Sequence, residues 1–227
     1  MIALSAIVGR RAGAARLFHF VRAEGGMALL EFALALPMLL GLIFGALEMS
    51  NYIIASNTVQ RLATASADML SQTGIGNVST TESQIYDMFY AMDVAAKPLD
   101  MRNRGRIILT VIKGVQNGST VQNQFADTIF SQQFDGGYVG ANILLGCHSS
   151  VTLPIYGRTL PANEIMVHAQ VSYQYAPLLG GAKLLSYFTV PAVITRTAVF
   201  RMRKNTFNIT NDSTHPPKSK CTSATGV

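Results

Sequence analysis

Residues 22–50 of this chain read RAEGGMALLEFALALPMLLGLIFGALEMS, and this stretch decides the fold. Between Met27 and Leu47 the only charged residue is Glu31. A helix rises about 1.5 Å per residue, so these residues cover roughly 32 Å, close to the ~30 Å hydrocarbon core of a bilayer. The stretch therefore predicts a single membrane-spanning helix near the N-terminus. A carboxylate is costly in lipid, so Glu31 needs either a partner or a function.

The residues that precede the apolar stretch are basic. They include four arginines, which the positive-inside rule keeps in the cytoplasm: Arg10, Arg11, Arg16 and Arg22. This leader ends in Gly25-Gly26, and Glu31 is the fifth residue after Gly26. A secretory signal is cut after its apolar core. A glycine before the apolar run, with a glutamate at the fifth position, is instead typical of a prepilin-peptidase site, at which the helix stays on the mature protein.

On these residues the chain resembles type IV pilin precursors. The run EFALALP at residues 31–37 more narrowly resembles the TadE/TadF-like minor pseudopilins of the tight-adherence (Flp, type IVc) pilus system. The resemblance is clear over about residues 10 to 70. It implies that prepilin peptidase cuts between Gly26 and Met27. It also implies that Glu31 pairs with the N-terminal ammonium of its own chain or of a neighbouring subunit.

Three further residues of the apolar stretch bear on subunit packing. Pro37 removes one backbone hydrogen bond, which predicts a kink that membrane helices tolerate. Gly41 and Gly45 form a Gly-x-x-x-Gly pair, which permits two helices to approach closely. The alternative is that glycine is simply common in membrane helices. Together with Glu31, these residues are the predicted subunit-packing site.

Beyond Glu48 the helix is expected to continue with a narrower apolar stripe. Its residues recur at spacings of three and four: Met49, Tyr52, Ile53, Ser56, Val59, Leu62, Ala63, Ala67 and Leu70. Gly74 and Gly76 are expected to end the helix near Ser71. An ordinary single-pass anchor does not need this amphipathic extension, whereas a pilin stalk does, because its second half packs under a globular head.

The rest of the chain predicts an α+β head. Residues 79–97 read as a short helix with a capping box, either Ser79 with Glu82 or Thr81 with Gln84. Its expected buried stripe consists of Ile85, Met88, Phe89 and Met92. The apolar period then changes to two, which predicts an antiparallel sheet with strands at 106–115, 120–125, 164–175 and 187–203. Asn117-Gly118 predicts the turn between the first two strands.

These elements predict four parts of the chain and the fold class α+β. They are a basic leader (1–26), a transmembrane and amphipathic stalk helix (27–73), a periplasmic α+β head (79–204) and a flexible tail (205–227). Residues 130–150 are rich in Gly, Gln, Asn and Ser and are expected to be irregular. The tail is polar and is expected to bury little.

The two cysteines, Cys147 and Cys221, both follow the membrane segment. In an oxidising periplasm they are a candidate disulfide, and two unpaired thiols are the alternative. Cys147-His148 lacks a nearby carboxylate or a second His/Cys pair, so no metal site is expected. No phosphate-binding loop, metalloprotease motif or nucleophile elbow occurs, so neither an enzyme nor a cofactor is expected. The net charge of +6 is concentrated in the leader and near the C-terminus, so it does not predict nucleic-acid binding.

The resemblance implies a minor pseudopilin that helps to assemble or initiate a Tad pilus. Its partners would be prepilin peptidase and other pilin-like subunits, and it would cross the bacterial inner membrane once with its head in the periplasm, later entering an extracellular pilus. The length of 227 residues and Phe32, where a major Flp pilin has tyrosine, argue against the repeating shaft subunit. The alternative is an uncleaved, membrane-anchored periplasmic binding module in which Glu31 is incidental.

Overall fold

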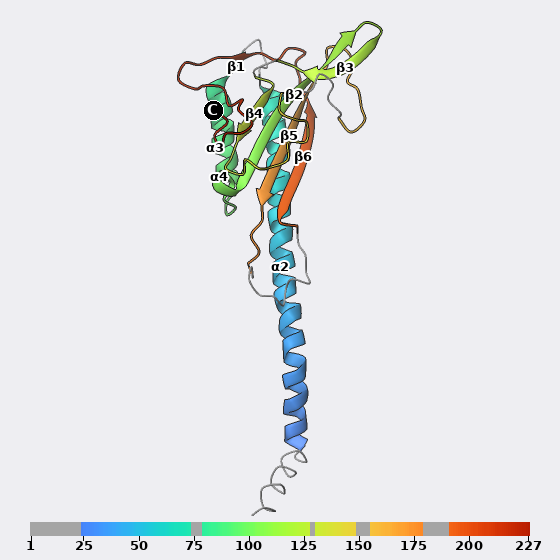
Figure 1. Cartoon of the computed structure of the whole chain (residues 1–227), viewed down its shortest axis with the longest axis vertical. Coiled ribbons are helices and arrows are strands. Elements are labelled where there is room, and N and C mark those ends of the chain that lie inside the picture. The colour runs from blue at the N-terminus through green and yellow to red at the C-terminus, as the bar shows by residue number, and fades with distance from the viewer. Residues whose placement is uncertain (1–23, 74–78, 128–129, 149–154, 179–190) are drawn as a thin grey trace, which may run out of the picture. The chain divides into compact units, whose positions relative to one another are not determined.

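The computed structural model describes residues 24–73, 79–127, 130–148, 155–178 and 191–227 (Figure 1). The described residues fall into two compact units, and each is considered by itself. The first holds residues 24–50 and consists of helix. The second is the head, which holds all the described residues from Asn51 onward. The expected helix-ending residues Gly74 and Gly76 lie outside the described residues.

The predicted long apolar helix is confirmed. Helix α2 runs from Glu24 to Gln72 and is unbroken at Pro37. The predicted kink at Pro37 stays a prediction. Among the described residues, α2 is the one helix that is long and apolar enough to cross a membrane. A helix with apolar side chains on all sides avoids water only in lipid or among other helices.

The second half of α2 belongs to the head and buries a stripe of small and aliphatic side chains. These residues are Ala55, Ser56, Val59, Leu62, Ala63, Ser66, Ala67 and Leu70. The predicted stripe is therefore confirmed from Ser56 onward. It is wrong for Met49 and Ile53, whose side chains are half exposed, because the core of the head begins only at Ala55.

The short helix α3 (Glu82–Ala95) is confirmed together with its N-terminal capping box. Thr81 accepts a hydrogen bond from the Gln84 backbone N–H, and the Gln84 side chain accepts one from the Thr81 backbone. Ile85, Phe89 and Met92 are buried, and Met88 packs against them from a half-buried position. Two further elements were not expected. These are the one-turn helix α4 (Met101–Arg104) and the strand β1 (Thr80–Thr81), which pairs with β7 (Ile209–Thr210).

The predicted antiparallel sheet is confirmed, and with it the α+β class. Its strands are β2 (Gly105–Asn117), β3 (Thr120–Phe125), β4 (Gln132–Asp135), β5 (Ile165–Gln174) and β6 (Val193–Arg201). The spatial order is β3-β2-β5-β6, and β4 also pairs with β2 (Figure 1). Gly118 has a φ of +61° in the tight turn between β2 and β3, as the Asn-Gly pair predicted.

Strand β4 was missed because its four residues, QQFD, carry no apolar alternation. It pairs with Ile107–Thr110, on the edge of β2 that β3 occupies further along. The last strand begins at Val193, two residues after Pro191, and the expected residues 187–190 lie outside the described residues.

Both faces of the sheet are covered. One face contributes alternate residues of β2, β5 and β6 to a single core with α2 and α3. The other face carries Arg106, Thr110, His168 and Gln170, which are all at most 4% exposed. Chain from the connection after β4 and from the C-terminus lies over it.

The segment 205–227 differs from the flexible tail that the sequence predicts. It contributes strand β7, and Phe207, Ile209, Lys218 and Cys221 are each at most 9% exposed. The physical reason is that this segment is held by one disulfide and by hydrogen bonds to its main chain. Neither of these leaves a periodic pattern in the sequence.

Candidate functional site

The predicted processing residues Gly26, Met27 and Glu31 all lie in the first turns of α2, and all three are exposed. Helix α2 already begins at Glu24, so the bond between Gly26 and Met27 is helical. Gly25 and Gly26 favour unwinding, since each glycine costs a helix about 1 kcal/mol relative to alanine.

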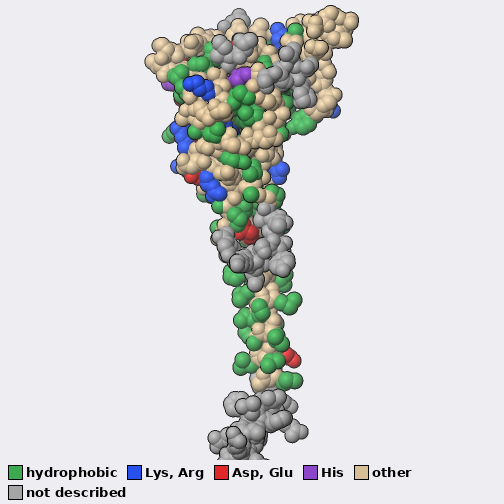
Figure 2. Space-filling view, viewed as in Figure 1, with side chains coloured by type: hydrophobic (Ala, Val, Ile, Leu, Met, Phe, Trp, Pro, Cys, Tyr) green, Lys and Arg blue, Asp and Glu red, His purple; other side chains and the backbone are tan. Residues whose placement is uncertain are grey.

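The apolar side chains of α2 between Met27 and Leu47 form a long exposed hydrophobic surface. The residues exposed by at least two fifths are Met27, Leu29, Leu30, Phe32, Leu34, Met38, Leu39, Leu40, Leu42, Ile43, Phe44 and Leu47. Figure 2 shows hydrophobic side chains along both edges and the visible face of this part of the helix. A surface of this size marks contact with lipid or with other helices.

The predicted packing residues Pro37, Gly41 and Gly45 recur every four residues, so they lie on one side of α2, each turned by about 40° from the last. Gly41 and Gly45 are half exposed. A methyl group built on Gly41 would meet no other atom within 4 Å. This side of α2 therefore has room for the backbone of another helix to come close.

Residues 26–68 match the model of the TadE-like protein family. The match begins at Gly26, and it ends inside the part of α2 that packs in the head. Proteins of that family belong to the Tad pilus system and are in general not enzymes. No curated protein and no solved structure matches the chain.

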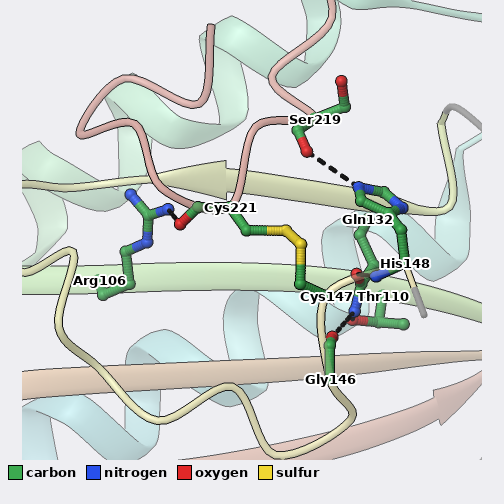
Figure 3. The surroundings of a disulfide bond; sticks show 8 residues. All are labelled: Arg106, Thr110, Gln132, Gly146, Cys147, His148, Ser219 and Cys221. Carbon is green, nitrogen blue, oxygen red and sulfur yellow. Dashed lines mark hydrogen bonds between the residues drawn. A yellow bond between two sulfur atoms is a disulfide. The ribbon is translucent and has the colours of Figure 1, made fainter. Parts of the chain in front are cut away.

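In the head, outside the TadE-like segment, Cys147 and Cys221 form a disulfide (Figure 3). Their Cα atoms are 6.1 Å apart, and 74 positions separate them in the sequence. The bond ties the connection after β4 to the C-terminal segment. The buried amide of Gln132 holds the residues on either side of Cys147, because it donates to the Gly146 carbonyl at 2.9 Å and accepts from the His148 N–H at 3.0 Å.

The neighbouring His148 also has a structural role. Its Nε2 lies 2.9 Å from the Ser219 carbonyl oxygen, on the same C-terminal segment as Cys221. Its ring packs edge-on against Phe134. Within the described ranges, no three His, Cys, Asp or Glu side chains are grouped so that they could hold a metal ion.

The side chain of Arg106 binds main-chain carbonyls of the same C-terminal segment. Its guanidinium is buried and donates to the carbonyls of Cys221 at 2.7 Å, Ser223 at 2.6 Å and Gly136 at 3.0 Å. Burial lowers the pKa of Arg106, and the negative charge of Asp135 partly opposes this. The sequence indicated only that Arg106 begins a strand. A charged residue next to the apolar run Ile107–Leu109 was the available signal that the Arg106 side chain meets polar groups.

A buried ion pair completes this attachment. Lys218 Nζ lies 2.7 Å from Asp135 Oδ1, and both side chains are less than 10% exposed. Lys218 Nζ also donates to the Thr225 carbonyl and lies 4.4 Å from the centre of the Tyr86 ring. Glu82, fully buried, accepts a hydrogen bond from Gln133, and burial raises the pKa of its carboxyl group. Sequence reasoning missed these residues because buried ion pairs require partners far apart in the chain.

We predict that replacing both cysteines with serine lowers the stability of the head. Opening a loop of this length should reduce the free energy of unfolding by about 4 kcal/mol. Urea unfolding of the full chain in detergent, followed by tyrosine circular dichroism, measures this change. Wild-type protein under reducing conditions is the matched control and should unfold at the same urea concentration as the double variant. An unchanged midpoint in the double variant would contradict a stabilising bond.

We also predict that His168 makes the head less stable in acid. Burial lowers the pKa of His168 from 6.5 to about 4, so the folded head keeps it neutral where the unfolded chain protonates it. The free energy of unfolding is therefore unaffected by His168 above about pH 6.5. It falls as the pH falls towards 4, on the order of 3 kcal/mol in total. His168→Gln should remove this part of the pH dependence, measured by urea unfolding at several pH values. His215→Gln, at a partly exposed histidine, should retain it.

Proposed function

We propose that this chain is a minor pseudopilin, cut by prepilin peptidase between Gly26 and Met27, that takes part in assembling or initiating a Tad pilus. The observation that carries the proposal is the TadE-like match over residues 26–68, which begins at the glycine before the proposed cut. The exposed apolar surface of α2 and the room beside Gly41 support it, since a pilus subunit must pack its helix among others.

Glu31 acquires a partner under this proposal. Cleavage creates an ammonium group on Met27, within about one helical turn of the Glu31 carboxylate. In a low-dielectric bundle, opposite charges at such a distance attract strongly, whereas an unpaired carboxylate is costly. An incoming subunit whose Glu31 pairs with the ammonium of a docked subunit would thereby fix the axial position of one helix relative to the next.

The proposed topology is a single pass through the bacterial inner membrane. The arginines of the leader favour a cytoplasmic N-terminus. The disulfide between Cys147 and Cys221 favours a head in an oxidising compartment such as the periplasm. The partners are then prepilin peptidase, which meets the chain at Gly26, and other pilin-like subunits of the Tad machinery, which meet it along α2.

Processing is tested by the intact mass of the full chain expressed with a Tad prepilin peptidase. We expect wild-type protein to lack residues 1–26 and Gly26→Ala to keep them, because a side chain next to the cut bond would clash in a tight peptidase site. Gly25→Ala is the matched control, one residue away, and should still be cut after Gly26. A full-length mass for all three proteins would overturn the proposed processing and favour the anchored binding module.

Assembly is tested with Glu31→Gln, which keeps the shape of the side chain but removes its charge. We expect this variant to be cut normally and to be at least about tenfold depleted from sheared extracellular pili, because one lost ion pair in low dielectric exceeds 1.4 kcal/mol. Glu24→Gln, in the leader that is removed, should have no effect on incorporation. Wild-type levels of Glu31→Gln in the pili would show that the carboxylate does not guide docking.

A further inference from the structure

The exposed apolar surface does not end with the apolar stretch of the sequence. In the head, Ile53 and Ile54 on α2 are 50% and 59% exposed, and Leu178 is 68% exposed. Ile53 follows Leu47 by six residues along an unbroken helix, or about 9 Å. Leu178 follows Tyr175 by three residues, and Tyr175 contacts the first turn of α2 in the head through Tyr52. We call Ile53, Ile54 and Leu178 the collar.

The length of the helix determines where the collar can lie. From Met27 to Ile54, α2 carries exposed apolar side chains over 28 residues, or about 42 Å. The hydrocarbon core is only ~30 Å thick, but a bilayer measures about 40–45 Å with its headgroup layers. With the helix upright in the bilayer, one or both ends of this apolar surface would therefore lie among headgroups.

The charges on α2 favour lipid at the collar end. With Leu47 at the boundary of the hydrocarbon, Glu31 would lie about 6 Å inside the opposite boundary. With Ile54 instead of Leu47 at the first boundary, Glu31 would lie about 4.5 Å outside the opposite boundary, where a charge costs less. The second position places Glu48 about 9 Å inside the hydrocarbon, but its side chain is only 5% exposed, so protein atoms rather than lipid surround it.

The polar groups around the collar suit a headgroup layer. Asn51 donates to the Tyr175 hydroxyl at 2.8 Å, and the Tyr52 and Tyr175 rings pack edge to face at 5.3 Å. Tyrosines are enriched at this depth in membrane proteins. Between Glu48 and Asp68, the one charged residue of α2 is the exposed Arg61, a cation that suits a phosphate-bearing surface.

We propose that Ile53, Ile54 and Leu178 form a lipid-facing collar that holds this end of the head in the headgroup layer of the membrane. The collar would set the depth of α2 before the subunit joins a filament, and it would keep Glu31 at the opposite interface until a partner is present. This inference rests on membrane anchoring and does not depend on cleavage after Gly26. Processing is scored separately by mass, so either idea can fail alone.

The chain contains no tryptophan, so single tryptophans can report on the collar without background. The full chain is reconstituted in phosphatidylcholine vesicles as Ile53→Trp, Leu178→Trp or Met69→Trp. Met69 is the matched control, because it is 42% exposed on the same helix but lies 16 residues, or about 24 Å, beyond Ile53. Quenching is measured with lipids brominated near the headgroup end of their acyl chains and with aqueous iodide.

We expect both collar tryptophans to be quenched by brominated lipid about twofold or more above Met69→Trp, and to be shielded from iodide. Tryptophan itself prefers interfaces, so Leu178→Trp is also measured together with Ile53→Ser and Ile54→Ser. Removing these two side chains should lower the lipid quenching at position 178.

Two results would overturn the proposal. In one, the collar and Met69 tryptophans are quenched alike, or the serine substitutions change nothing, and the collar does not lie in lipid. In the other, the collar tryptophans are shielded from iodide without lipid quenching, and the shielding disappears when the protein is diluted in lipid. That result would assign the collar to contact with another protein subunit.

Discussion

The close packing of α2 on the sheet is the interaction on which the head depends. Ala63 and Ala67 are fully buried, and they belong to one core cluster with the apolar residues of β2 and β5. Such burial is favourable because apolar area is removed from water and each buried atom gains neighbours at van der Waals distance. The same helix that carries the exposed TadE-like surface therefore forms the centre of the head's core.

The opposite face of the sheet is stabilised by a different kind of interaction. It is polar, with Arg106, Thr110 and His168 buried in it, and such groups are costly unless they are paired. The C-terminal segment supplies many of the partners, as carbonyl oxygens for Arg106 and as the ammonium of Lys218 for Asp135. The disulfide then holds this segment to the connection after β4, so closure of the head depends on oxidation as well as on burial.

The two faces of the sheet have different roles. The helix-covered face joins the head to α2, whose apolar residues are suited to lipid and to other helices. The disulfide-closed face is stabilised by contacts within the chain, among them the carbonyl oxygens that bind Arg106 and the ion pair between Lys218 and Asp135.

The sequence by itself determined the elements whose signal is local. The span of α2, the presence of a capping box before α3 and the turn at Asn117-Gly118 all depend on local sequence, although the structure decided that the box is that of Thr81 and Gln84. The candidate site residues from Gly26 to Gly45 also come from a local pattern and from the family resemblance, and they stay a prediction. Only the tertiary structure decided the pairing of β4, the burial of the segment 205–227 and the roles of Arg106 and Lys218. Each of these depends on contacts across dozens of residues, which pair polar groups and leave no periodic trace in the sequence.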